Sequence, residues 1–282
     1  MPSIILVKYP DNFKAYVENT QNTCNAMLMD VSTVVNDSDL FICCLALHFL
    51  GKFLNVIPME SVAQAYHTHL YTKIMKLASS SLLQGPAQDV LVSLLQTMTQ
   101  MNMSSMSYDD MFSLLYESNG TVTGKKEEES MDVASDTNTT VTAAGKKQSA
   151  YNVAVAIGGM LSVVDNKLDL TVAKLVSDLS GTDEIKKHLA LWCLGVIGQK
   201  IDLSNTSGLE QHIMACFSSS SQDTQTAAAY ALGMNGTFHY FPSSRSLSLS
   251  LSLSRSLLDS DALVLTSFMH MLIMLSSSFL SR

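Results

Sequence analysis

One thirteen-residue pattern occurs three times in this chain and constrains its fold more than any other feature. The first copy, Asp39–Gly51, aligns without a gap with Asp183–Gly195, and Ser221–Gly233 is a looser third copy. The first two copies are 144 residues apart, close to four units of 36, and the third follows 38 residues later. Periods of about 35–45 residues are typical of helical solenoids, whose extended surfaces hold partners. The pattern predicts an all-α HEAT/armadillo-type α-solenoid.

Each copy has the features of a helix that packs between neighbours. It opens with polar residues, whose side-chain oxygens can accept hydrogen bonds from the first helical turn. Apolar residues then recur every three or four positions and form a stripe that can pack inward. A glycine closes each copy, at Gly51, Gly195 and Gly233. Because glycine within a helix costs about 1 kcal/mol relative to alanine, its recurrence predicts close approach of a neighbouring helix.

The sequence between the copies predicts further helices, which together make about five antiparallel pairs. A single unit buries too few side chains to offset the entropy of ordering about 38 residues, so the units must stack. The predicted helices are residues 66–77, 86–98, 108–117, 151–164, 168–179 and 209–217. The predicted organisation is HEAT-type repeats at 1–116 and 148–241, a disordered polar insertion at 117–147, and a low-complexity tail at 242–282 outside the fold.

Composition restricts the class of partner and the compartment. The net charge of −8 argues against a nucleic acid bound through its phosphates. The five cysteines (Cys24, Cys43, Cys44, Cys193, Cys216) show no zinc-ligand spacing and indicate buried free thiols of a reducing compartment. The apolar amino-terminal stretch is too short for a secretory signal. Most of the 17 methionines are expected to fill the core.

No local motif supports catalysis, so we assign no catalytic, cofactor-binding or metal-binding residue and expect no small-molecule substrate. Gly195–Lys200 superficially resembles a phosphate loop, but its spacing is wrong and it falls on a repeated helix. His67 and His69 are two residues apart on a predicted helix and would point away from each other rather than share a metal. Trp192 is interpreted as a packing residue between repeats. Residues that bind a partner cannot be assigned from these patterns.

On this repeating frame, two segments resemble one family. Glu184–Leu203 (EIKKHLALWCLGVIGQKIDL) and Gly208–Gly233 (GLEQHIMACFSSSSQDTQTAAAYALG) are similar to the cullin-associated, neddylation-dissociated proteins, also called TATA-binding-protein-interacting proteins. Val35–Asp39, Leu70–Ile74 and Ser81–Gly85 are similar to preceding HEAT repeats of that family. The resemblance extends from about Leu6 to Phe241, except for the insertion.

The resemblance implies a scaffold that wraps an unmodified cullin–RING ubiquitin ligase, in the cytoplasm and nucleus. Such a scaffold blocks the ubiquitin-like modification of the cullin and promotes SCF assembly and exchange of substrate receptors. The family's chains are several times longer, so we expect an internal fragment with partial or no exchange activity. The alternative interpretation is a general HEAT-repeat adaptor that binds other proteins.

The tail departs from the family. Leucine and serine alternate from Ser246 to Ser254, as a translated dinucleotide repeat would produce, and we interpret this tail as aberrant sequence. Ala262–Leu280 follows with no charged residue and is long enough to cross a bilayer. A tail-anchored membrane protein is therefore a further alternative, although serines and nearby aspartates weaken it and we do not expect a membrane partner.

Overall fold

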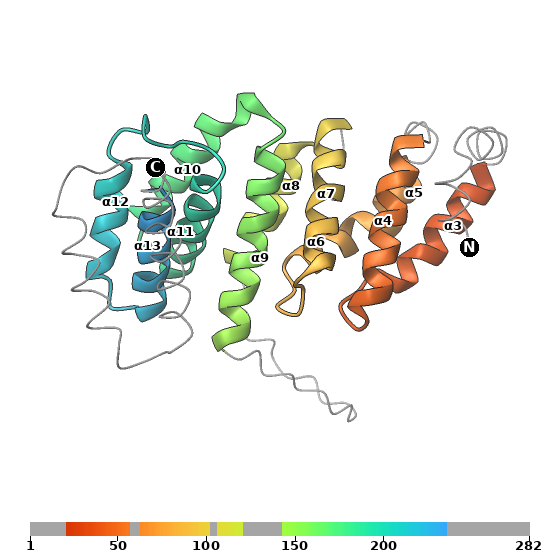
Figure 1. Ribbon diagram of the computed structural model, residues 1–282, viewed down its shortest axis with the longest axis horizontal. Coiled ribbons are helices and arrows are strands. Elements are labelled where there is room, and N and C mark those ends of the chain that lie inside the picture. The colour runs from red at the N-terminus through yellow and green to blue at the C-terminus, as the bar shows by residue number, and fades with distance from the viewer. Residues whose placement is uncertain (1–20, 57–62, 102–105, 121–142, 236–282) are drawn as a thin grey trace, which may run out of the picture. The chain divides into compact units, whose positions relative to one another are not determined.

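The computed structural model describes residues 21–56, 63–101, 106–120 and 143–235, and every regular element in these ranges is helical. All of them belong to one compact unit, residues 1–235 (Figure 1). The all-α α-solenoid prediction is confirmed. The described residues contain five successive helix pairs, as the repeat spacing predicts.

Within each pair, a first helix is followed by the helix that carries the repeated pattern or its equivalent. The pairs are α3 (Gln21–Val34) with α4 (Leu40–Val56); α5 (Ala63–Tyr66), the π-helical turn η2 (His67–Tyr71) and α6 (Thr72–Ala78) with α7 (Pro86–Met101); α8 (Tyr108–Gly120) with α9 (Ala143–Leu161); η3 (Asp165–Lys167) and α10 (Leu168–Leu179) with α11 (Glu184–Gly198); and α12 (Leu209–Ala215) and η4 (Cys216–Ser218) with α13 (Gln222–Asn235).

The pairs stack so that their helices form two layers. In the second-helix layer, α4 packs on α7, α7 on α9, α9 on α11, and α11 on α13. The first helices lie behind it, with α6 against α8 and α10 against α12. Each pair also packs internally, and the core between the layers is continuous along the described helices. Because each helix buries residues against the next pair, no pair has a core of its own.

The predicted helix starts are confirmed where the copies begin. Asp39 Oδ1 accepts hydrogen bonds from the backbone N–H groups of Phe41 and Ile42, both at 3.0 Å. Asp183 Oδ1 accepts from the backbone N–H groups of Ile185 at 3.0 Å and Lys186 at 3.3 Å. The two aspartates therefore cap α4 and α11 in the same way, as their equivalent positions in the pattern require.

The glycines of the pattern do not all have the predicted packing role. A Cβ added at Gly195 would lie 2.5 Å from two ring carbons of Tyr230 and 3.2 Å from the Cα of Ala231, so α13 approaches α11 closely there. The prediction was wrong for Gly51, where no atom lies within 4 Å of such a Cβ. The glycine recurs in the repeated pattern, but α7 does not approach α4 closely at Gly51. For Gly233 the prediction stays a prediction.

A buried amide side chain makes several of the hydrogen bonds that join the second pair to the third. Asn152 of α9 is 2% exposed, and its Nδ2 donates to the backbone carbonyls of Ser80 at 2.7 Å and Leu83 at 2.8 Å. Its Oδ1 accepts from Gln88 Nε2 at 2.9 Å and from Gln148 Nε2 at 2.8 Å. The amide thus joins α9 to the turn between α6 and α7 through Nδ2, and to Gln88 of α7 through Oδ1.

The predicted boundaries are refined at two places. Helix α8 continues to Gly120 and α9 begins at Ala143, so the predicted disordered insertion 117–147 was wrong at both of its ends, which are helical. Residues 121–142 and the tail 242–282 lie outside the described residues, so the predicted disorder and the aberrant tail stay predictions. Among the described helices, none combines the length and apolarity needed to cross a bilayer. Ala262–Leu280, the predicted anchor, lies outside them as well.

Candidate partner-binding surface

Three helices of the second-helix layer bring aromatic side chains together. Tyr151 of α9, Trp192 of α11 and Tyr230 of α13 are all half-buried and form what we call the aromatic cluster. The ring centroids of Trp192 and Tyr230 are 4.6 Å apart, and the ring of Tyr151 meets Trp192 edge-on at 5.5 Å. Trp192 and Tyr230 occupy the same position in two copies of the pattern, 38 residues apart. Packing of equivalent helices side by side therefore makes the cluster.

A histidine fixes the tryptophan ring. Trp192 Nε1 donates a hydrogen bond to His188 Nε2 at 2.9 Å, one helical turn earlier on α11. Burial of the imidazole lowers the pKa of His188, the nearby Asp223 carboxylate opposes this shift, and the Lys147 ammonium adds to it. Because Nε2 is an acceptor, the neutral ring carries its proton on Nδ1. The prediction that Trp192 packs between repeats is confirmed.

An ion pair between α9 and α13 lies near His188. Lys147 Nζ of α9 lies 2.8 Å from Asp223 Oδ1 of α13, and the two side chains are 37% and 48% exposed. The surface therefore combines half-buried aromatic rings with exposed charges of both signs. Tryptophan and tyrosine flanked by polar groups are the residues that most often dominate protein–protein binding energy. This arrangement suits a protein partner.

The structure places two of the segments that the sequence analysis considered for chemistry. Gly195 lies within α11, which confirms helix packing for the phosphate-loop-like segment. The ring of His67 stacks on Tyr71 at 5.1 Å within η2 rather than facing His69. No group of three or more potential metal ligands occurs in the described ranges.

The cysteines behave as predicted from their spacing. None of the five forms a disulfide; Cys24, Cys43, Cys193 and Cys216 are buried and Cys44 is half-buried. Burial raises the pKa of Cys193, so its thiol stays protonated. Four of these side chains belong to the core, and Cys44 packs against it.

The aromatic cluster is the feature that sequence reasoning missed. Trp192 and Tyr230 could have been paired, because the gapless alignment of two copies places them at one position. Tyr151 offered no such signal, since it lies one turn earlier than the equivalent position on α9. Its contact with the other two rings depends on how far neighbouring helices are shifted along their axes.

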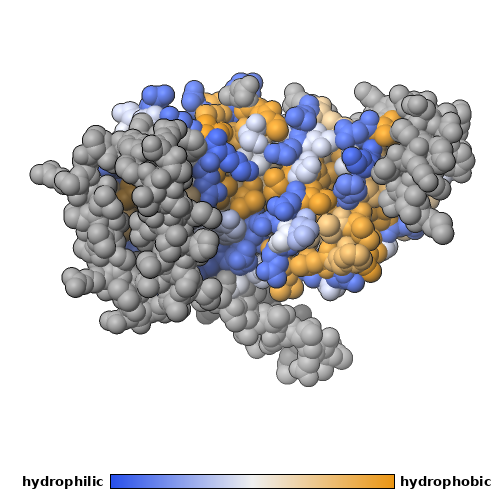
Figure 2. Space-filling view, in the orientation of Figure 1, coloured by the Kyte–Doolittle hydropathy of each residue, from blue (hydrophilic) through white to orange (hydrophobic). Residues whose placement is uncertain are grey.

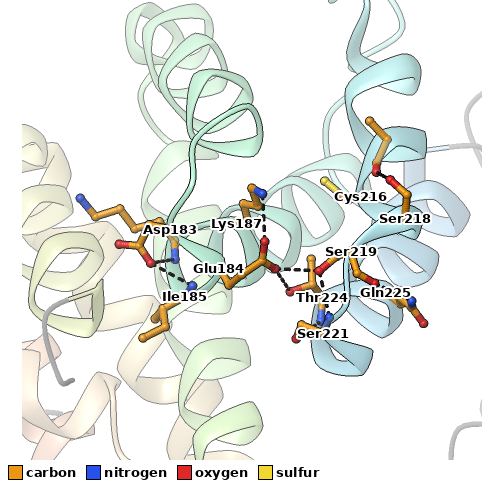
Figure 3. A network of polar contacts seen from close by, with 12 residues as sticks. Asp183, Glu184, Ile185, Lys187, Cys216, Ser218, Ser219, Ser221, Thr224 and Gln225 are labelled. Atoms are coloured by element: carbon orange, nitrogen blue, oxygen red, sulfur yellow. Dashed lines mark hydrogen bonds and ion pairs between the residues drawn. The ribbon is translucent and has the colours of Figure 1, made fainter. Parts of the chain in front are cut away.

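A polar network holds α11 and α13 in the register that forms the cluster (Figure 3). Glu184, the first residue of α11, accepts hydrogen bonds from Lys187 Nζ at 2.9 Å, Ser219 Oγ at 2.8 Å and Thr224 Oγ1 at 3.0 Å. Ser219 lies in the turn before α13, and Thr224 is a fully buried residue of α13. The hydrogen bond from Lys187, followed by that from Ser219, lowers the pKa of Glu184.

This network predicts a specific pH dependence of stability. Since the folded state lowers the pKa of Glu184, the stabilisation is present above the unfolded pKa of about 4.3 and is lost as pH falls through the folded pKa. The Glu184 side chain is 42% exposed, so water screens the interaction and the effect should be about 1 kcal/mol or less. Urea denaturation of the E184Q variant between about pH 3 and 7 should give a flatter stability profile than the natural chain. E210Q, at an exposed position of α12, is the control; an equal change in both profiles would contradict the assignment.

The sequence is similar to three proteins that share one name. Cullin-associated NEDD8-dissociated protein 1 of Drosophila melanogaster is 26% identical over 229 residues, 81% of this chain and 17% of the relative. The proteins of that name from Dictyostelium discoideum and Arabidopsis thaliana are 27% and 29% identical over 209 and 212 residues, each covering 73% of this chain. These matches cover 15% and 16% of those relatives. The chain thus spans about a sixth of their length. No family model matches the sequence.

Proposed function

This chain belongs to the cullin-associated NEDD8-dissociated family, and on that premise we propose that it is a non-enzymatic scaffold that binds a cullin. The observation that carries the proposal is the sequence relationship over 73–81% of the chain. The stacked helix pairs support it, because solenoids present extended surfaces to protein partners.

The finer activity is also a proposal. We propose that the partner is a cullin–RING ligase and that the chain favours the form without NEDD8, as the relatives' name implies for those proteins. Regulation of SCF assembly and substrate-receptor exchange would follow from such selective binding. Because the chain spans about a sixth of its relatives' length, we expect this activity to be partial. Localisation in cytoplasm and nucleus, where cullins would be met, is testable by fluorescence microscopy of the tagged chain.

Direct binding tests the proposal. The purified full chain should retain an unmodified cullin–RING complex at least about ten-fold better than the NEDD8-modified complex, a difference of about 1.4 kcal/mol. Equal retention of both forms would contradict the selectivity, and retention of neither would contradict cullin binding. Retention of other proteins alone would favour the general HEAT adaptor.

The aromatic cluster provides the residue-level test. We expect W192A to weaken cullin binding by about ten-fold or more, because a large aromatic anchor is lost from the surface. L170A is the matched control, since Leu170 is 69% exposed but lies on α10 in the first-helix layer. Circular dichroism must show that both variants keep their helices. Equal binding by W192A and the natural chain would show that the cullin contacts a different part of the surface.

A further inference from the structure

The side chain that fixes the Trp192 ring is itself titratable. His188 is half-buried on α11, one helical turn before Trp192, and its Nε2 accepts the hydrogen bond from Trp192 Nε1 at 2.9 Å. Nε2 can accept this bond only while the imidazole is neutral, because both ring nitrogens of an imidazolium are donors. We propose that His188 is a pH-dependent positioning residue, which holds the Trp192 ring in the aromatic cluster when neutral and releases it when protonated.

The geometry of the two rings makes the observed contact incompatible with a proton on Nε2. The ring planes are nearly perpendicular, at 85°, and the centroids are 6.2 Å apart, so the rings meet edge-on and do not stack. Trp192 Nε1 is a donor only and cannot adapt by accepting a hydrogen bond. A protonated His188 would set two N–H groups against each other. Protonation therefore removes the hydrogen bond that fixes the indole.

Charged groups from both neighbouring second helices act on His188. Asp223 of α13 favours the protonated imidazole, Lys147 of α9 opposes it, and these two side chains form an ion pair with each other. On α11 itself, Glu184 lies one turn earlier, where Lys187 donates a hydrogen bond to its carboxylate. The aromatic cluster adds only phenols, which carry no charge where histidine titrates. A protonated His188 thus has Asp223 as an alternative partner once the tryptophan contact is lost.

The release is expected in a mildly acidic range. Burial of the imidazole lowers the pKa of His188 from its ordinary value of 6.5. The hydrogen bond to the neutral form acts in the same direction. The ring is therefore neutral above about pH 6.5 and takes up a proton as pH falls below that value. Because the unfolded chain binds this proton more readily than the folded chain, stability should also fall as pH decreases through this range.

The consequence for binding rests on the proposed cullin contact at the aromatic cluster. On the face seen in Figure 2, hydrophobic residues are interspersed with hydrophilic ones over the described helices, so apolar area alone does not single out one contact. A ring held in one orientation is a better anchor, because its side-chain entropy is lost before the partner binds. Protonation of His188 should therefore weaken the binding of a partner that docks on Trp192.

Fluorescence spectroscopy tests the release in the purified full chain, because Trp192 is its only tryptophan. An imidazolium quenches the emission of a neighbouring indole. When pH is lowered from about 8 to 5, the emission should fall with a midpoint below about pH 6.5. Circular dichroism over the same range should show that the helices persist.

Matched substitutions assign the transition to His188. H188Q offers an amide oxygen as acceptor for Trp192 Nε1 and cannot be protonated, so its emission should not change with pH. H188L offers no acceptor and should give the pH-independent emission of a released ring. H212Q is the control, because His212 lies beside Ser180 in the first-helix layer, and it should keep the natural transition.

Two charge variants test the surroundings of the imidazole. D223N should lower the midpoint of the transition, because it removes the carboxylate that favours the imidazolium. K147M should raise the midpoint, because it removes the opposing ammonium group. Each shift should be about 0.2–0.7 pH units, since both side chains are partly exposed and water screens them. Shifts in the same direction would contradict the charge arrangement.

Three results would overturn the proposal: an emission that does not change with pH, a transition that persists in H188Q, or a transition that coincides with loss of helix. Where half of His188 is protonated, retention of the unmodified cullin–RING complex should be about two-fold weaker than at high pH, with no such loss in H188Q. An equal loss in H188Q would overturn the link to binding. A chain whose emission titrates as expected but that retains no cullin at any pH would support the release and contradict the cullin proposal instead.

Discussion

Replacing Asn152 with alanine should lower the free energy of unfolding by about 3 kcal/mol or more. The variant loses all four hydrogen bonds of the amide, and the carbonyls of Ser80 and Leu83 lose their side-chain donor. Because the site is almost fully buried, water cannot readily replace that donor. Urea denaturation followed by circular dichroism measures the change.

Gln148→Ala is the matched control for this variant. Gln148 donates one of the two hydrogen bonds that Asn152 Oδ1 accepts, and the bond from Gln88 remains. We expect a loss of about 1 kcal/mol or less. Hydrogen exchange should show that N152A loosens the turn between α6 and α7 before the helices farther along the array. Equal losses in N152A and Q148A would mean that the two carbonyl contacts contribute little.

Replacing Gly195 with alanine should destabilise the chain, although alanine is the better helix former. Alanine would favour the helix by about 1 kcal/mol, but its methyl group would lie 2.5 Å from the ring of Tyr230. That ring is packed against Trp192, and the backbone Cα of Ala231 lies at 3.2 Å, so neither neighbour can yield freely. Overpacking of this kind typically costs about 1–3 kcal/mol, so after the helix preference is subtracted we expect a net loss of about 1 kcal/mol, and at most about 2.

Gly51→Ala provides the opposite expectation at the aligned position. No atom lies within 4 Å of the added methyl group, so the helix preference of alanine acts alone. G51A should therefore be neutral or more stable by up to about 1 kcal/mol. Thermal denaturation of the two variants should shift the melting temperature in opposite directions or leave G51A unchanged. A stable G195A would mean that α13 can move away from α11 without cost, and W192A would then be the better probe of the contact.

The periodic sequence by itself determined the helical architecture of this protein. The spacing of the copies predicted stacked helix pairs, and Asp39 and Asp183 marked helix starts that the structure confirms. These features are local, because a cap and an amphipathic stripe involve residues within a few positions of each other. The runs at 184–203 and 208–233 also carried the family relationship, which the relatives confirm.

Only the tertiary structure decided which equivalent residues have equivalent roles. Gly51 and Gly195 are the same residue at one position of the pattern, yet only Gly195 is in close contact with a neighbouring helix. Leu45 is exposed where its counterpart Leu189 is buried. The aromatic cluster and the contacts of Asn152 join residues from different helix pairs, and they depend on the distance and axial shift between helices. Those quantities follow from the packing of all side chains in both layers, and a local repeat does not encode them.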